Sequence, residues 1–325
     1  MNPEHPHSAT GPQPYPLILR TGSYAWWRPV LGLVLIPVSM FLIAPLALLP
    51  LLFVTVAIDH QGSFQSAVEK AANLDPVVWQ GLLYVNLSLA VLVLAAWAVV
   101  RFVHGLAPRW LMSVRPGIRW RFFWACFGLS VVAILAQIVV GALLPSDPND
   151  LGGSANEWTS RLVALALVVL VTTPIQAMGE EYVFRGYLMQ AFGALTRRPW
   201  LAVVLSAVLF ALAHGVQNAP LFLDRLAFGL MAGYVVLRTG GLEAGIALHI
   251  WNNLAAFGFA LTLGSIDDTL NVTEVSWSNI PLTITQNGVY LLLVLWMARR
   301  MGISSRTAPP VLEPVPVLPP TTPSV

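Results

Sequence analysis

Eight apolar runs, each long enough to cross a lipid bilayer, constrain the fold of this chain more than any other feature. A helix needs about 20 residues to cross a hydrocarbon core of roughly 30 Å. Only 10% of the residues are charged and the mean hydropathy is +0.72, far from the balance of an average soluble domain. The sequence therefore predicts an all-α, polytopic membrane protein with about eight transmembrane helices. The runs lie near residues 30–58, 80–104, 121–144, 160–182, 200–217, 222–238, 242–264 and 280–298.

The two ends of the chain differ from this apolar body. Residues 1–28 are polar and proline-containing and lack the apolar run of a cleavable signal, so we expect a disordered tail. Residues 301–325 are rich in proline and are predicted to be a second disordered tail. Residues 29–300 between them form the predicted helical bundle.

Basic residues predict the orientation of the bundle. Eight crossings leave both termini on one side of the membrane. If this side is the cytoplasm, the segments on it hold thirteen arginines, whereas the opposite side holds only Lys70, Arg161 and Arg225. We therefore place both termini in the cytoplasm. The preference for arginine over lysine and the abundance of Ala, Val and Leu favour a bacterial cell membrane.

Net charge and cysteine content bear on possible partners, disulfides and metal sites. A formal charge of +2 gives no indication of a nucleic-acid partner, and none is expected. The single cysteine, Cys126, excludes an internal disulfide and a cysteine-based metal cluster.

The stretch GEEYVFRG, residues 179–186, places three charges directly after an apolar run. A charge inside a bilayer usually faces a cavity or a partner. Glu181 and Arg185 are four residues apart and share a helix face, so they are expected to pair. Glu180 points about 100° away and is left as a candidate general base. The alternative is a cluster without chemistry, in which the charges extend to the membrane interface.

Two of the six histidines, His214 and His249, lie inside predicted spans, and Asn253 follows His249 by one helical turn. Each histidine alone is more often a hydrogen-bonded structural group. Together with Glu180, they could position and deprotonate a water, while an amide and an imidazole N–H stabilise an oxyanion. Glu180, His214 and His249 could equally bind a divalent metal such as zinc.

Three motifs in this order resemble the CAAX prenyl protease type II family, which includes the bacterial Abi or CPBP proteins. They are EExxxR at Glu180, Glu181 and Arg185, FxxxH at Phe210 and His214, and HxxxN at His249 and Asn253. The resemblance covers roughly residues 160–260.

The resemblance implies an intramembrane helical bundle and a role for each of the six polar motif residues. Glu180 would activate a water with help from His214, and His249 with Asn253 would stabilise the tetrahedral intermediate. Glu181 and Arg185 would shape the site. Eukaryotic members act on the C-terminal tripeptide that follows a prenylated cysteine. Both a metal-dependent and a metal-independent glutamate mechanism are proposed for the family.

The leading hypothesis is an intramembrane endopeptidase that acts on a lipidated or otherwise membrane-associated peptide or protein. One alternative is a non-proteolytic scaffold or immunity protein of the same fold, although a scaffold gains nothing from an unpaired buried glutamate. Another is a proton-coupled secondary transporter, which predicts a repeat with paired broken helices that the sequence does not show.

The depth of the motif residues in the bilayer sets one further expectation. If the fourth span ends near residue 182, Glu180 and His214 come to lie at opposite surfaces and cannot share a water. We therefore expect the fourth span to be long, tilted or kinked near Pro174, with residues 186–198 not dropping directly to the surface.

Overall fold

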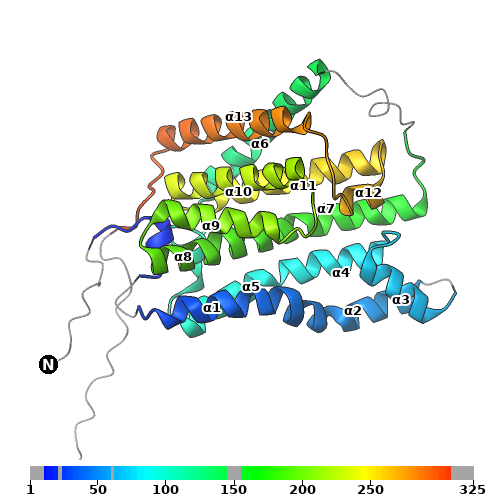
Figure 1. Ribbon diagram of the computed structural model, residues 1–325, viewed down its shortest axis with the longest axis horizontal. Helices are drawn as coiled ribbons and strands as arrows, with labels where there is room; N and C mark the ends of the chain where they lie inside the picture. The colour runs from blue at the N-terminus through cyan, green and yellow to red at the C-terminus, as the bar shows by residue number, and fades with distance from the viewer. Residues whose placement is uncertain (1–10, 21–23, 60–61, 145–154, 309–325) are drawn as a thin grey trace, which may run out of the picture.

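The computed structural model describes residues 11–20, 24–59, 62–144 and 155–308. These residues form a bundle of helices, with two isolated β-bridges and no strand among them, which confirms the predicted all-α class (Figure 1). The α-helices are α1 (Trp27–Val38), α2 (Ala44–Ile58), α3 (Phe64–Asn73), α4 (Trp79–Ala90), α5 (Leu92–Ala98), α6 (Trp120–Leu143), α7 (Ser160–Glu181), α8 (Met189–Thr196), α9 (Pro199–Leu212), α10 (Ala219–Thr239), α11 (Glu243–Thr262), α12 (Ile266–Leu270) and α13 (Asn279–Arg300). Short 3-10 or π-helical turns are η1 (Tyr15–Leu17), η2 (Ser39–Ile43), η3 (Val99–Val103), η4 (Pro108–Leu111) and η5 (Tyr182–Leu188).

Seven helical segments of the described chain are long and apolar enough to cross a membrane, and the shorter α9 is an eighth apolar element. Many large apolar side chains on these segments are exposed on the outside of the bundle, as a lipid-facing surface requires. The protein is therefore a polytopic membrane protein, as predicted. The seven segments are Trp27–Ile58, Trp79–Val103, Trp120–Leu143, Ser160–Thr196, Ala219–Thr239, Glu243–Thr262 and Asn279–Arg300.

The fourth segment does not end near residue 182. It continues through the π-helical turn η5 and through α8 to Thr196, so it spans 37 residues or about 55 Å. The fifth predicted run, near residues 200–217, is correspondingly short, because α9 ends at Leu212. The expectation of a long fourth span is confirmed.

This extension removes the conflict in depth between the two motifs. Sixteen residues separate Glu180 from Thr196, about 24 Å of helix, and fifteen separate Pro199 from His214, about 22 Å. Since α8 and α9 pack together and reverse direction at the turn between them, Glu180 and His214 come to similar levels.

The helices stack so that the fourth segment lies inside the bundle. α7 contacts α4 on one side and α11 on the other, and α11 in turn contacts α6, which packs on α13. α9 and α10 lie beside this stack, and α1 and α2 form its outer layer (Figure 1). The motif-bearing helices are therefore surrounded by helices that carry no motif.

Parts of the predicted disordered tails are folded, which corrects the sequence-based expectation. Tyr15 is fully buried and its hydroxyl donates to the Leu111 carbonyl, and Ile18 and Leu19 are buried beside it. The described end of the other tail is also packed, because a β-bridge joins Arg306 to Pro14. Apolar residues within the polar tail supply this packing. Residues 1–10, 21–23 and 309–325 of the predicted tails lie outside the described part.

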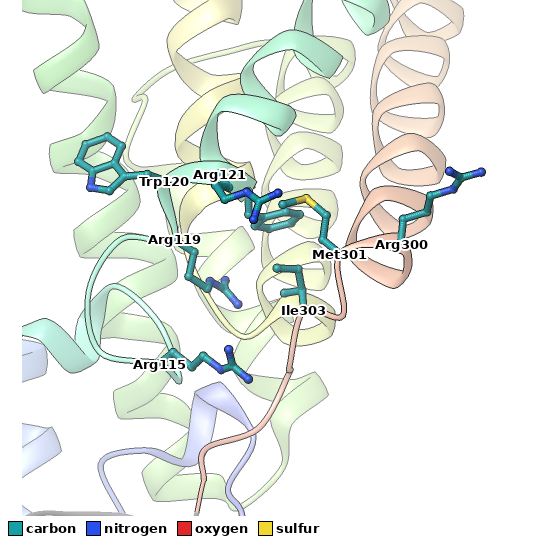
Figure 2. Close-up of a pocket in the computed structure, with 8 residues that line it drawn as sticks. Arg115, Arg119, Trp120, Arg121, Arg300, Met301 and Ile303 are labelled. Atoms are coloured by element: carbon teal, nitrogen blue, oxygen red, sulfur yellow. The ribbon is translucent and has the colours of Figure 1, made fainter.

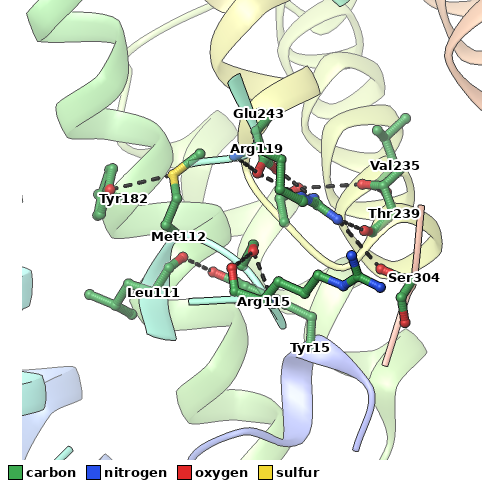
Figure 3. A network of polar contacts seen from close by, with 12 residues as sticks. Tyr15, Leu111, Met112, Arg115, Arg119, Tyr182, Val235, Thr239, Glu243 and Ser304 are labelled. Carbon is green, nitrogen blue, oxygen red and sulfur yellow. Dashed lines mark hydrogen bonds and ion pairs between the residues drawn. The ribbon is translucent and has the colours of Figure 1, made fainter. Parts of the chain in front are cut away.

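A buried ion pair anchors the start of α11 (Figure 3). Arg119 Nη2 lies 2.5 Å from Glu243 Oε2, and its Nε donates to Glu243 Oε1 at 2.7 Å. The same guanidinium donates to the Thr239 carbonyl, just before the turn at Gly240, whose φ of 69° suits glycine. The pair fixes the turn between α10 and α11 and hence the direction of the helix that carries HxxxN.

Candidate active site

Three elements bring the motif residues together. The α7–η5 segment carries Glu180, Glu181 and Arg185, and α11 carries His249 and Asn253. The third motif lies at the end of α9, where Phe210 is in the last helical turn and His214 follows in the chain turn after it.

Glycines allow α7 to approach its neighbours closely. A Cβ atom at Gly179 would lie 2.1 Å from the Leu89 carbonyl oxygen, so only glycine permits the observed contact with the end of α4. A Cβ atom at Gly245 on α11 would lie 2.6 Å from Oε2 of Glu181. These two positions set how deeply the glutamates sit between helices.

Glu181 holds Arg185 and His249 at once. Its Oε1 lies 2.8 Å from Arg185 Nη1 and 2.9 Å from His249 Nδ1, and all three side chains are buried. The expected pair of Glu181 and Arg185 is thus present. The contact with His249 was not expected from the sequence, and it ties α11 to the fourth segment through a fully buried carboxylate.

Aromatic rings enclose the Arg185 guanidinium. Its central carbon lies 4.0 Å from the ring centroid of Phe210 and 5.1 Å from that of Phe228. Its Nε and Nη2 atoms have no hydrogen-bond partner among the described residues, so cation–π contacts complete its environment. Arg185 lies in η5, where Ser206 donates a 2.6 Å hydrogen bond to the Phe184 carbonyl. Such π-helical turns recur at functional sites.

Glu180 is not unpaired, which corrects the sequence-based interpretation. Gln176, one turn earlier on α7, donates from Nε2 to Glu180 Oε1 at 2.6 Å. The other oxygen, Oε2, lies 3.5 Å from Nε2 of His249. Glu180 is only 8% exposed, so both of its oxygens face protein groups in a buried site.

The contacts of His249 define its tautomer. Oε1 of Glu181 accepts from Arg185, so it is also the acceptor toward His249, and Nδ1 of the imidazole must carry the hydrogen. In the neutral ring Nε2 is then an acceptor, and it faces Oε2 of Glu180, which also accepts when ionised. These two acceptors face one another at 3.5 Å, and a small movement of either side chain lets one donor molecule give a hydrogen to each.

His214 lies at the open side of this cluster. His214 is exposed, and its Nδ1 lies 2.7 Å from the Phe210 carbonyl oxygen. The centroids of the His214 and Phe210 rings are 4.7 Å apart. The carbonyl can only accept, so Nδ1 donates and Nε2 is left as an acceptor. His214 interacts electrostatically with Glu180. The ring of Phe210 also contacts that of His249, with the two centroids 6.0 Å apart. The FxxxH motif thus borders the two glutamates.

Asn253 contacts the site through a residue that sequence reasoning missed. Its Nδ2 donates to Gln176 Oε1 at 3.1 Å, and Gln176 in turn donates to Glu180. Gln176 is a buried amide in an apolar span, four residues before Glu180. This spacing was a signal that could have identified it from the sequence.

The described side chains do not provide a metal site. No group of three or more His, Cys, Asp or Glu side chains in residues 11–20, 24–59, 62–144 and 155–308 is arranged to hold a metal ion. Glu180, His214 and His249 are likewise not gathered as such a group, although only Nδ1 of each histidine is engaged by protein and Nε2 is left as an acceptor. The metal-dependent alternative stays a prediction.

Comparisons with known proteins agree with the motifs. Residues 161–255 match the family described as type II CAAX prenyl endopeptidase Rce1-like, and all three motifs lie within this range. The match confirms the resemblance to this family over the motif-bearing core. The family is one of peptidases, and the apolar helices indicate that this protein sits in a lipid bilayer.

Two bacterial proteins are similar over longer or shorter parts of the chain. YyaK of Bacillus subtilis (strain 168), described as uncharacterized, is 26% identical over 294 residues, which cover 86% of this chain and 94% of that protein. An uncharacterized 24.3 kDa protein of Escherichia coli is 25% identical over 130 residues, 39% of this chain and 58% of that protein. No solved structure matches the chain significantly.

Proposed function

We propose that this protein is an intramembrane endopeptidase in which Glu180 activates a water to hydrolyse a peptide bond. The observation that carries the proposal is that Glu180 Oε2 and His249 Nε2 face each other at 3.5 Å. A further residue hydrogen-bonds the other side of each group. Gln176 holds the carboxylate and Glu181 holds the imidazole.

The chemistry follows from the two acceptors. A water that donates one hydrogen to Glu180 and the other to His249 directs its lone pairs outward, toward a substrate carbonyl. Glu180 takes the proton as the water oxygen attacks, and the tetrahedral intermediate forms. The proton then passes to the departing amine, so that peptide and water become a carboxylate and an amine.

An oxyanion on the former carbonyl needs hydrogen-bond donors. Asn253 supports the proposal here, because its amide has two N–H groups and donates one of them to Gln176. The second can serve the oxyanion. A neutral His249 presents an acceptor at Nε2, so it donates to an oxyanion only after it has gained a proton. His214, at the open side of the site, assists Glu180 in activating the water.

The substrate is proposed from the family match. We expect a membrane-associated peptide or protein, with a lipidated C-terminal segment as the first candidate. Both termini are proposed to lie in the cytoplasm of a bacterial cell, which the basic residues of the loops support. The described terminal segments lie at one end of the bundle, in agreement with this orientation (Figure 1).

The test is cleavage of two synthetic peptides by purified protein in detergent. One peptide ends in a prenylated cysteine followed by three residues, and the other lacks the prenyl group. Glu180→Gln is expected to reduce cleavage by about 100-fold to 10,000-fold. Glu69→Gln is the matched control, because Glu69 is exposed on α3 and also accepts a hydrogen bond from a glutamine four residues earlier.

The same assay separates the proposed mechanism from its alternatives. Cleavage is expected to persist in EDTA, because the described residues offer no three-ligand metal site. Loss of cleavage in EDTA that zinc restores would contradict the metal-free mechanism. A scaffold or a transporter would cleave neither peptide.

A further inference from the structure

A second polar site lies at the end of the bundle that carries the two described terminal segments. One of its residues, Arg119, pairs with Glu243 at the start of α11, six residues before His249. A cavity of about 610 Å³ opens there between the first turn of α6 and the last turn of α13. Four arginines and no acidic residue are among the described residues that line it, namely Arg115, Arg119, Arg121 and Arg300.

Three of these arginines lie along one side of the cavity (Figure 2). The side chains of Arg115, Arg119 and Arg121 extend to the same side, toward the chain segment that carries Met301 and Ile303. Arg300 lines the opposite rim and stacks on Trp296 at 5.0 Å. The cavity therefore concentrates positive charge that is not balanced from within its own lining.

The arginines differ in whether protein groups already engage them. Arg119 is committed to Glu243 and to the Thr239 carbonyl. Arg115 and Arg121 are exposed, and no side-chain hydrogen bond or ion pair joins either guanidinium to the described residues. Protein contacts thus hold the Arg119 side chain in place, while the guanidinium groups of Arg115 and Arg121 are available to bind an anion.

The position of the cavity indicates which anion it meets. α6 and α13 are both membrane-spanning candidates, and the cavity lies where they end. Trp120 and Trp124, one turn apart on α6, are 56% and 59% exposed, as aromatic side chains at a membrane–water interface are. A group that enters between these arginines is therefore at the level of lipid headgroups.

We infer that this cavity binds the phosphodiester of an anionic phospholipid headgroup through Arg115 and Arg121, above the buried Arg119–Glu243 pair. Guanidinium groups match phosphate oxygens with two parallel hydrogen bonds. The start of α6 adds the positive end of the helix dipole, where Glu243 Oε1 already accepts the backbone N–H of Arg119. This inference does not depend on the proposed peptidase activity.

The experiment measures binding of a fluorescent phosphatidylglycerol to the full-length, delipidated protein in detergent. Arg115→Gln with Arg121→Gln is expected to weaken binding by about 10-fold or more, while fluorescent phosphatidylcholine binds weakly to both proteins. The matched control is Arg198→Gln with Arg238→Gln. It removes two exposed arginines from the same end of the bundle, outside the cavity.

Two outcomes would overturn the inference. Equal weakening by the control pair would show that overall surface charge attracts the lipid, and would overturn the site. Competition by inorganic phosphate as effective as that by phosphatidylglycerol would show a site for a soluble anion and overturn the lipid assignment. Thermal unfolding checks the fold of each variant. If the double variant unfolds, Arg121→Glu alone makes the same comparison against Arg238→Glu.

Discussion

The Nδ1 atom of His249 lies 2.9 Å from Oε1 of Glu181. This contact joins α11 to the fourth membrane segment and fixes which imidazole nitrogen faces Glu180. It makes Glu181, the fully buried member of the pair of glutamates, the group that orients the site. The proposed mechanism depends on this division between a positioning and a reacting carboxylate.

Removing the charge of Glu181 is expected to destabilise the fold. Glu181→Gln leaves the buried guanidinium of Arg185 without a carboxylate, which costs about 3 to 5 kcal/mol of the free energy of unfolding. The double variant Glu181→Gln with Arg185→Met should lose less than the sum of the two single variants. Denaturant titration in mixed micelles measures these energies, and an unchanged stability of Glu181→Gln would refute the role of the pair.

Gly245 should not tolerate a methyl group. An alanine Cβ there would meet Oε2 of Glu181, so Gly245→Ala is expected to reduce stability by about 1 to 3 kcal/mol and to reduce cleavage. Gly258 is the control on the same helix, because a Cβ atom added there would have nothing within 4 Å. Gly258→Ala should be neutral or stabilising by about 0.4 to 1 kcal/mol. Equal effects of both changes would contradict the close contact.

Gln176 is expected to act as a positioning residue. Gln176→Leu removes a hydrogen bond to a carboxylate, so kcat should fall by about 10-fold to 100-fold with little change in KM. Gln65→Leu is the control, since Gln65 makes the same contact to Glu69 on exposed α3. Steady-state kinetics with the cleaved peptide measure both constants. A change confined to KM would indicate a role in substrate binding instead.

The motifs predicted which residues lie at the site, but they predicted only some of the hydrogen bonds and ion pairs among them. Helical spacing was sufficient for the Glu181–Arg185 pair, because both residues lie on one helix. The contact between Glu181 and His249 depends on how α7 packs against α11, which spacing within one helix cannot reveal. The partner of Glu180 was missed because a glutamine in an apolar run carries no charge, although its spacing of four residues was visible.

The number of apolar runs predicted the bundle, but hydropathy misjudged where two of them end. Polar residues of GEEYVFRG interrupt the fourth run, so the sequence suggested an end near residue 182. The structure shows that Glu181 and Arg185 neutralise one another inside the protein, and the helix continues to Thr196.

The N-terminal segment was missed for another reason. Tyr15 and its apolar neighbours are too few to be predicted as a helix from the sequence, yet they are buried against the bundle.

His104 should make stability depend on pH. It lies outside the membrane segments and bonds to Tyr187 at 3.0 Å. Burial, and secondarily the charge of Arg28, lower the pKa of His104 from 6.5 to about 4. The folded state therefore binds fewer protons than the unfolded state between these values. Stability should fall as the pH drops from about 6.5 to about 4, by about 3 kcal/mol in total.

Thermal unfolding between about pH 4 and pH 7 checks this prediction. His104→Gln removes the titrating group and should flatten this part of the pH dependence, whatever its effect on stability at neutral pH. A variant with the same slope as the original protein would show that other groups cause it.

The most direct test of the central claim is chemical rescue of Glu180→Ala. The variant removes the proposed base and leaves space for a small carboxylate, so cleavage should fall by about 100-fold to 10,000-fold and formate should restore part of it in a saturable manner. Glu181→Ala should not respond, because its carboxylate orients His249 and pairs with Arg185. Cleavage by Glu180→Ala within a few-fold of the original rate, without formate, would contradict the proposed role of Glu180.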